Sequence, residues 1–252
     1  MRGLRPRLVA ALVAATLVTA GLAVGGPAPA AAAPAKNPVL VSAGLSSPGF
    51  SVDLLAARLR ADGFTVYTLD PLPGFGFGDI GASANAVASK VAQIKAATGA
   101  AKVDLVGHSE GGLVNRYYLK FLGGTQHVGR YVSLGSPQHG TALANLGVFF
   151  ADCLGVVACQ QMAIGSSFLA NLNSGDETPG SVAYTAIATT QDELVQPYGN
   201  AFLQDGATNV KFQSHCWFRV VGHLGLIIDG AVYGLVRSAL QGKSPSTNCF
   251  AL

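Results

Sequence analysis

A serine lies at the centre of the segment Gly107-His108-Ser109-Glu110-Gly111, and its surroundings predict a nucleophile. The apolar residues 103–106 predict a buried strand before it, and residues 112–119 predict a helix after it. A sharp turn between strand and helix, flanked by glycines, presents a serine hydroxyl at the edge of a sheet. The backbone N–H of Glu110 then begins a helix, where free donors and the helix dipole favour a developing oxyanion. The alternative interpretation is a glycine-rich turn with a capping serine, because the pentapeptide alone is a weak signal.

A serine hydroxyl is a poor nucleophile until a base takes its proton, and that base needs an acid to orient it. In this turn motif the three residues follow the chain order serine, acid, histidine. Asp192 is the best acid, because it follows the strand-like residues 184–189 and precedes a loop, at the carboxyl end of a predicted strand. Asp176 is the alternative, although its surroundings are typical of a turn or cap. The other acids after the serine are Asp152, Glu177, Glu193, Asp205 and Asp229.

Two histidines, His215 and His223, come late enough in the chain to act as the base. His215 lies within a strand-like run, where its side chain could face the core or solvent. His223 lies between the strand-like residues 218–222 and the last predicted helix, and a loop of this kind suits a mobile imidazole. The sequence therefore predicts a triad of Ser109, Asp192 and His223.

Alternating apolar segments predict the fold that must position these residues. Short apolar runs alternate with segments of helical periodicity, which argues for a parallel sheet with helices on both faces. The chain is too short for the eight repeats of a barrel, so we predict a compact α/β fold with a mostly parallel sheet of about six strands. The expected strands are 38–42, 64–69, 103–106, 128–134, 182–188 and 210–213, and the expected helices are 51–61, 81–98, 112–119 and 225–240.

Residues 140–171 interrupt this alternation. The stretch is long for a plain connection, and it contains the apolar residues 146–150 and two close cysteines. Insertions of this kind often cover active sites, so we expect a lid. The alternative is an ordinary buried helix pair.

Residues 1–33 have the composition of a signal peptide. Arg2, Arg5 and Arg7 form a basic start, residues 8–24 are almost wholly apolar, and the small residues that follow offer several cleavage sites. An uncleaved membrane anchor is the alternative, but no stop-transfer charges follow the apolar run. We therefore expect secretion, with residues 34–252 forming a single catalytic domain without an integral membrane segment.

The charge balance argues against nucleic acid as a partner. The chain has 16 Lys and Arg against 13 Asp and Glu, and the leader contains three arginines and no acids, which leaves 13 of each sign. A net charge of zero favours neither nucleic acid nor anionic membranes. The glycine-rich residues 71–79 lack both a G-x-G-x-x-G spacing and a lysine, so nucleotide binding is not predicted.

Four cysteines remain after the leader: Cys153, Cys159, Cys216 and Cys249. An even number in an exported chain predicts two disulfides. Three pairings are open, of which the local pairs look most natural, and free buried thiols are the alternative. Because no Cys and His cluster has metal-ligand spacing, we expect no metal and no cofactor.

Several further blocks accompany the serine motif, and together they are more specific than the motif alone. They are Ser42-Ala43-Gly44-Leu45, Ser133-Leu134-Gly135-Ser136-Pro137-Gln138-His139-Gly140-Thr141 and Leu172-Asn173-Ser174-Gly175-Asp176-Glu177-Thr178-Pro179-Gly180. On these blocks, from about residue 38 to the C-terminus, the chain resembles the secreted bacterial class 2 lipase/esterase family, within the α/β-hydrolase superfamily.

The resemblance implies an α/β-hydrolase fold, and it points to Asp192 as the acid. One departure stands out: such lipases usually carry His-Gly after the first strand, where this chain has Ala43-Gly44. An oxyanion hole uses backbone N–H groups, so we expect the donors to be Leu45 and Glu110.

These observations predict a secreted serine carboxylester hydrolase, a lipase or esterase that works through an acyl-enzyme. The expected substrate is a small-molecule or lipid ester, with transient contact at a lipid interface, and the expected state is a monomer. The alternatives are a cutinase-like polyesterase or an acyltransferase with the same triad, or a non-catalytic protein of this fold that binds lipid or cell wall.

Overall fold

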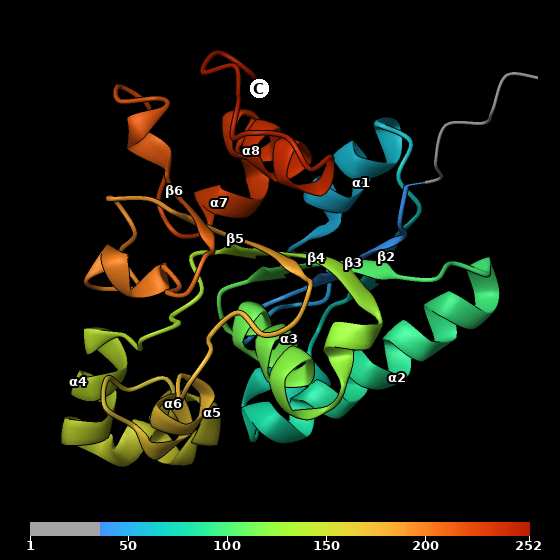
Figure 1. The fold of residues 1–252 in the computed structure, drawn as a ribbon. Coiled ribbons are helices and arrows are strands. Elements are labelled where there is room, and N and C mark those ends of the chain that lie inside the picture. The colour runs from blue at the N-terminus through green and yellow to red at the C-terminus, as the bar shows by residue number, and fades with distance from the viewer. Residues whose placement is uncertain (1–35) are drawn as a thin grey trace, which may run out of the picture. The chain divides into compact units, whose positions relative to one another are not determined.

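A sheet of six parallel strands organises the chain in a computed structural model that describes residues 36–252, apart from the side chains of residues 148–151 (Figure 1). The strands lie in the order β2-β1-β3-β4-β5-β6, and every pairing is parallel. This confirms the predicted α/β sheet. The signal peptide predicted at residues 1–33 lies outside the described residues. The strands are β1 (Val39–Ser42), β2 (Val66–Leu69), β3 (Val103–His108), β4 (Val128–Leu134), β5 (Ala183–Ala188) and β6 (Thr208–Lys211).

The strand order creates a crevice at the carboxyl ends of β1 and β3. The chain runs from β1 outward to β2 and then returns to β3 on the other side of β1. The loops that leave β1 and β3 therefore diverge, and ligands bind at such switch points in parallel sheets. The register pairs Ser42, at the end of β1, with Gly107 in β3. The segment after β1 thus lies beside the serine motif.

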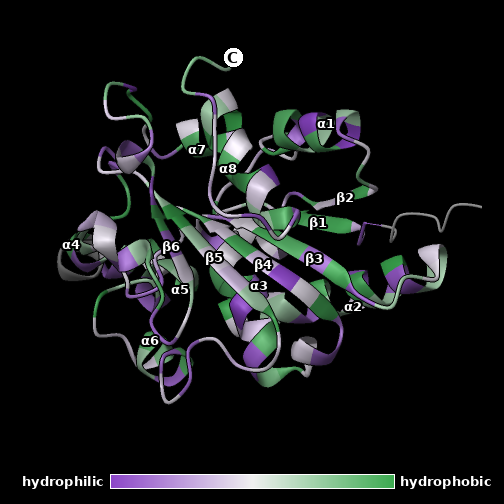
Figure 2. Ribbon diagram, turned by 45° about the horizontal axis from the view of Figure 1, so that its top comes forward, coloured by the Kyte–Doolittle hydropathy of each residue, from purple (hydrophilic) through white to green (hydrophobic). Residues whose placement is uncertain are grey.

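Helices lie on both faces of the sheet (Figure 1). One face carries α1 (Asp53–Ala61), α7 (Gly225–Ile228) and α8 (Gly230–Leu240), and the other carries α2 (Ile80–Thr98) and α3 (Glu110–Phe121). Figure 2 shows polar and apolar residues on the same helices, as expected where only one side is buried.

Each face of the sheet has its own apolar core. Leu105 and Val106 are neighbours in β3, yet they belong to different core clusters. The reason is that successive strand residues point to opposite faces. Both residues are fully buried, which explains why the strands read as continuous apolar runs rather than as alternating ones.

The insertion predicted at residues 140–171 folds as short helices that lie together in Figure 1. They are α4 (Ala142–Ala151), η3 (Asp152–Gly155), α5 (Val157–Gln161) and α6 (Ser167–Leu172). A disulfide between Cys153 and Cys159 closes this segment, and Cys216 is bonded to Cys249 near the C-terminus. These are the two local pairs. That the insertion acts as a lid stays a prediction. Four further 3-10 turns are η1 (Pro73–Gly76), η2 (Gly124–Gln126), η4 (Tyr198–Ala201) and η5 (Phe212–Ser214).

The end of the chain differs from the predicted elements. The helix expected at residues 225–240 is broken at Asp229, whose backbone is extended and whose Oδ1 accepts hydrogen bonds from the N–H groups of Ala231 and Val232. An aspartate that caps a helix in this way starts a new one. The strand expected at residues 210–213 lies earlier, as β6, and a 3-10 turn follows it. Among residues 36–252, no helix is long and apolar enough to cross a bilayer.

Candidate active site

Ser109 occupies a strained turn between β3 and α3. Its φ is 54° and its ψ is −128°, a conformation that side-chain-bearing residues rarely adopt. The strand and the helix approach closely here, because a Cβ added at Gly107 would lie 2.6 Å from the backbone of Gly112. Only glycine fits at such a position. The local sequence thus forces the serine side chain out of the turn and toward the crevice.

His223 and Asp192 form a buried pair next to this serine. His223 Nδ1 lies 2.9 Å from Asp192 Oδ2 and 3.0 Å from Oδ1, and each residue is 1% exposed. Asp192 Oδ1 also accepts hydrogen bonds from the N–H groups of Leu194 (2.9 Å) and Val195 (2.7 Å). The carboxylate is therefore anchored in the loop after β5, and it leaves the Nε2 atom of His223 free for another partner.

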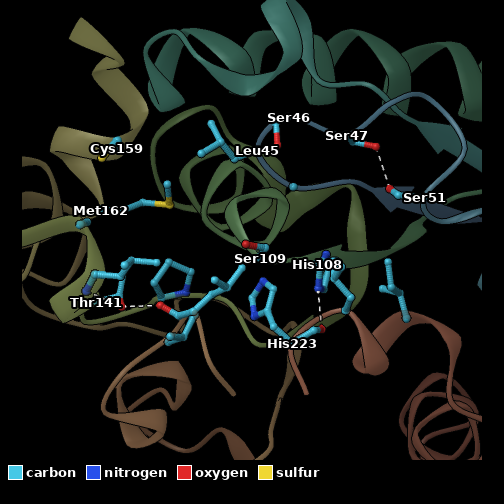
Figure 3. Close-up of a pocket in the computed structure, with 18 of the residues that line it drawn as sticks. Leu45, Ser46, Ser47, Ser51, His108, Ser109, Thr141, Cys159, Met162 and His223 are labelled. Atoms are coloured by element: carbon cyan, nitrogen blue, oxygen red, sulfur yellow. Dashed lines mark hydrogen bonds between the residues drawn. The ribbon is translucent and has the colours of Figure 1, made fainter. Parts of the chain in front are cut away.

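Figure 3 shows the ring of His223 beside Ser109, and both residues line one pocket. No hydrogen bond joins Ser109 Oγ to His223 in the part of the chain that the structure describes. Without a substrate, catalytic hydrogen bonds are often long and tighten only in the reacting complex. The arrangement can support proton transfer from the hydroxyl to the ring.

Gly135 follows β4 and explains how the pair fits against the sheet. Its φ is 54°, and a Cβ added there would lie 2.9 Å from Asp192 Oδ2 and 3.2 Å from His223 Nδ1. Any side chain at this position would push the pair apart. Nothing in the sequence around Gly135 indicates that its missing side chain makes room for residues more than fifty positions away.

His108, directly before the serine, packs against the proposed base. The two rings lie 4.6 Å apart, and His108 Nε2 is 3.1 Å from the backbone oxygen of His223. Burial, and repulsion by His223, lower the pKa of His108 to about 3. His108 is therefore neutral at neutral pH. A neutral His108 therefore adds no positive charge beside the ring of His223.

Among residues 36–252, the backbone N–H groups of Leu45 and Glu110, near Ser109, donate to no other group. Leu45 follows Gly44, where an added Cβ would lie 2.8 Å from the Cβ of Ser109. The loop after β1 thus passes directly against the serine, and the position of its donor depends on glycine at this point. The two N–H groups can serve as an oxyanion site.

The Glu110 side chain is an unexpected feature of the site. It is fully buried, and neither carboxyl oxygen has a hydrogen-bond partner within the described part of the chain. It faces Gly76, where an added Cβ would clash with Oε2. Burial raises the pKa of this carboxyl to about 8, so it is protonated at neutral pH. No feature of the sequence around Glu110 predicted this neutral state.

The pocket beside Ser109 has a volume of about 480 Å³ and is largely apolar (Figure 3). Its apolar lining includes Leu143, Ala144, Met162, Val195 and Ile227. These residues come from the insertion after β4, the loop after β5 and α7. A hydrocarbon chain fits such a lining.

The alternative site residues lie elsewhere. The Asp176 carboxylate accepts a hydrogen bond from the N–H of Thr178 in an exposed turn, as expected for a turn residue. His215 is exposed beside a disulfide. Neither lines the pocket that Ser109 borders. The structure therefore brings together Ser109, Asp192 and His223.

A buried arginine braces the helix that begins at the serine. Arg116 in α3 is fully buried and donates hydrogen bonds to the backbone oxygens of Glu177 (3.2 Å) and Leu172 (3.1 Å) and to Gln138 Oε1 (3.1 Å). The pKa of the Glu177 carboxyl is lowered: burial opposes this, but the nearby His139 and Arg116 side chains and a hydrogen bond from the N–H of Gln204 at 2.9 Å outweigh it. The network holds α3 against the loops that follow β4 and α6.

The family described as lipase (class 2) matches residues 87–224, a segment that contains Ser109, Asp192 and His223. Curated triacylglycerol lipases from Pseudarthrobacter phenanthrenivorans and Burkholderia plantarii are each 44% identical to this chain over 55 residues. That stretch covers 22% of this chain and only 17% and 15% of those proteins.

Two solved structures share the fold. Aspergillus fumigatus lipase B has a TM-score of 0.70 at 22% identity, with 83% of this chain and 54% of that chain covered. The mature form of Bacillus licheniformis lipase BlEst2 has a TM-score of 0.66 at 21% identity, with coverages of 82% and 93%. At these identities the likeness establishes the architecture and not the substrate.

Proposed function

This chain belongs to the class 2 lipase family, and from that premise we propose that it is a secreted serine carboxylester hydrolase acting on lipid esters. The observation that carries the proposal is the buried Asp192–His223 pair beside Ser109, at an apolar pocket. The curated relatives are triacylglycerol lipases, which favours the same reaction class. The predicted leader and the two disulfides support secretion, because disulfides persist in oxidising compartments.

In the proposed reaction, His223 Nε2 takes the proton of Ser109 as Oγ attacks the ester carbonyl carbon. Asp192 holds Nδ1–H, which keeps the ring in the correct tautomer and stabilises the imidazolium that forms. The carbonyl oxygen becomes an oxyanion that accepts hydrogen bonds from Leu45 and Glu110, and one such donor contributes about 3–4 kcal/mol.

The tetrahedral intermediate then collapses. The imidazolium of His223 returns its proton to the leaving alcohol oxygen, and an acyl-enzyme on Ser109 remains. Water repeats the sequence: His223 takes a proton from it, and the acid and the free serine hydroxyl are released. This chemistry is complete without a cofactor.

Exposed apolar side chains at the pocket support transient contact with a lipid surface. Leu143 and Leu224 both line the pocket and are 49% and 62% exposed, and Leu146 in α4 is 54% exposed. Apolar side chains gathered at a site mouth mark an interaction surface. Hydrolysis that accelerates when the substrate passes its solubility limit would indicate a lipase, and a smooth rate curve would indicate a plain esterase.

Ser109→Ala tests the proposal. The variant is expected to lower kcat for p-nitrophenyl butyrate by about 10⁶-fold, as removal of a triad nucleophile does, while its unfolding transition stays close to that of the wild type. Ser181→Ala, an exposed serine in the turn before β5, is the matched control and should keep full activity. A phosphonate that labels serine nucleophiles should modify the wild type and the control but not Ser109→Ala. Near wild-type turnover by Ser109→Ala would place the nucleophile elsewhere, and a folded wild type with neither turnover nor labelling would favour a non-catalytic binding protein.

A further inference from the structure

A small polar cluster borders the same pocket and is not used by the proposed reaction. Ser47, in the loop after β1, donates a hydrogen bond to Asp70 Oδ1, and Ser51 donates one to Asp70 Oδ2 at 3.0 Å. The two hydroxyl oxygens are only 2.7 Å apart. Ser47 and Ser51 both line the pocket, whereas Asp70 lies behind them at the end of β2 and also accepts a hydrogen bond from the N–H of Val52.

The cluster has fewer protons than contacts. Each hydroxyl supplies one proton, and a carboxylate supplies none. Three close contacts join Ser47, Ser51 and Asp70, so two hydroxyl protons cannot fill all of them. Ser47 Oγ also accepts a hydrogen bond from the N–H of Gly49 at 3.4 Å, but each hydroxyl oxygen can accept two, so both oxygens keep unused acceptor capacity. A ligand group that donates a proton, such as a hydroxyl, is what this cluster lacks.

The opposite wall of the pocket offers no such partner. Figure 3 shows Met162 on one side of Ser109 and Ser47 on the other. The polar side chain that shares the apolar side, Thr141, already accepts hydrogen bonds at Oγ1 from the N–H groups of Gln196 (3.1 Å) and Leu143 (3.3 Å). The pocket thus has one wall suited to hydrocarbon and one with acceptors for hydroxyl groups.

The chemistry decides which half of an ester faces the hydroxyl wall. The imidazolium of His223 must return its proton to the alcohol oxygen, so the alcohol lies on the His223 side of the serine. The acyl hydrocarbon fits the apolar wall beside Met162, so the alcohol half takes the other side of the pocket, where Figure 3 draws Ser47 and Ser51.

We propose that Ser47 and Ser51, held in place by Asp70, form a subsite that accepts a hydrogen bond from a free hydroxyl of the leaving alcohol. The favoured substrates are then esters of polyols, such as partial glycerides, over esters of simple alkanols. The inference rests on the proposed function, because it assigns the orientation of the ester at that site.

The test compares glycerol monobutyrate with ethyl butyrate, which share the acyl group and differ in the alcohol. Ser47→Ala and Ser51→Ala should each lower the ratio of the two kcat/KM values, glyceryl over ethyl, by roughly three- to tenfold, the effect of one lost hydrogen bond. Asp70→Asn should lower the same ratio although both hydroxyls remain. The amide NH2 of asparagine can donate hydrogen bonds to the serine oxygens, and it would then occupy the acceptor sites that the substrate hydroxyl needs. Ser181→Ala is the control whose ratio should equal that of the wild type.

The outcomes separate the two proposals. A ratio unchanged in Ser47→Ala, Ser51→Ala and their double variant overturns the subsite, even if both esters are hydrolysed. An equal loss of kcat/KM on both esters, together with slower labelling by a small alkyl phosphonate, also overturns the subsite. That result would mean that the two serines only maintain the structure of the loop. If the folded wild type hydrolyses neither ester, the proposed function itself fails.

Discussion

The buried Glu110 carboxyl should make the free energy of unfolding fall as pH rises from 6.5 to 8. The residue is fully buried without a hydrogen-bond partner in the described part of the chain, and its pKa in the folded state is raised to about 8. In the unfolded chain the ordinary value is 4.5. Between these values the native state binds the proton and the unfolded state does not. Stability contributed by the neutral acid is therefore complete below pH 4.5 and is lost as pH rises toward 8.

The size of the effect follows from the width of the pH interval between 6.5 and 8. One pH unit is about 1.4 kcal/mol for a single proton, so the step from pH 6.5 to 8 should cost about 2 kcal/mol. His108 acts in the opposite sense and in another range. Its pKa is lowered from 6.5 to about 3, so its contribution is present above pH 6.5 and is lost as pH falls toward 3. Above pH 6.5 the remaining contribution of His108 is below about 0.5 kcal/mol and has the opposite sign, so Glu110 dominates this interval.

Glu110→Gln tests the assignment, because an amide of the same shape does not ionise. Denaturant unfolding with the disulfides intact should show the wild type losing about 2 kcal/mol between pH 6.5 and 8, and the variant losing almost none. The buried amide carries a cost of its own, but that cost does not depend on pH. Asp53→Asn, which removes a charge from the exposed surface of α1, is the control and should keep the wild-type slope. Equal slopes for the wild type and Glu110→Gln would refute a neutral, buried Glu110.

Three further changes give measurable outcomes. Asp192→Asn should lower kcat by about 10⁴-fold with little change in fold, because the ring would be held in the wrong tautomer, and a steady-state assay showing less than tenfold would remove the acid from the triad. Gly135→Ala should lower kcat by about 10²-fold by displacing the Asp192–His223 pair, and unchanged kinetics would contradict the close packing at this turn. Replacing Cys216 and Cys249 together by serine should lower the free energy of unfolding by about 4 kcal/mol, and a denaturation midpoint equal to that of the wild type would argue against their bond.

Sequence patterns were most informative where the structure is local. The serine turn could be predicted because strand, glycine turn and helix lie within about twenty consecutive residues, and each has its own signature. The parallel sheet could be predicted for a similar reason, since strands buried on both faces read as continuous apolar runs. Asp192 and His223 were chosen by chain order and by their place in loops after strands. Their 2.9 Å contact, in contrast, belongs to the folded chain.

Predictions were weaker where two structures satisfy the same pattern. The apolar periodicity of residues 225–240 continues across Asp229, so it reads as one helix. The structure breaks there because the Asp229 carboxylate caps α8, while its other oxygen accepts a hydrogen bond from Arg219 Nε at 2.7 Å. That partner lies ten residues away and lacks any periodic relation to the helix.

The sequence alone determined the class of fold, the nucleophile candidate and the chemistry that a serine in such a turn can perform, because these depend on residue types and short spacings. Only the tertiary structure decided that Gly135 makes room for the acid and base, that Glu110 is buried without a partner, and that Asp70 gathers two serines from the neighbouring loop. Each of these depends on which strands become neighbours. Strand order brings distant residues within hydrogen-bond range, and it also determines which carboxyl groups are excluded from water.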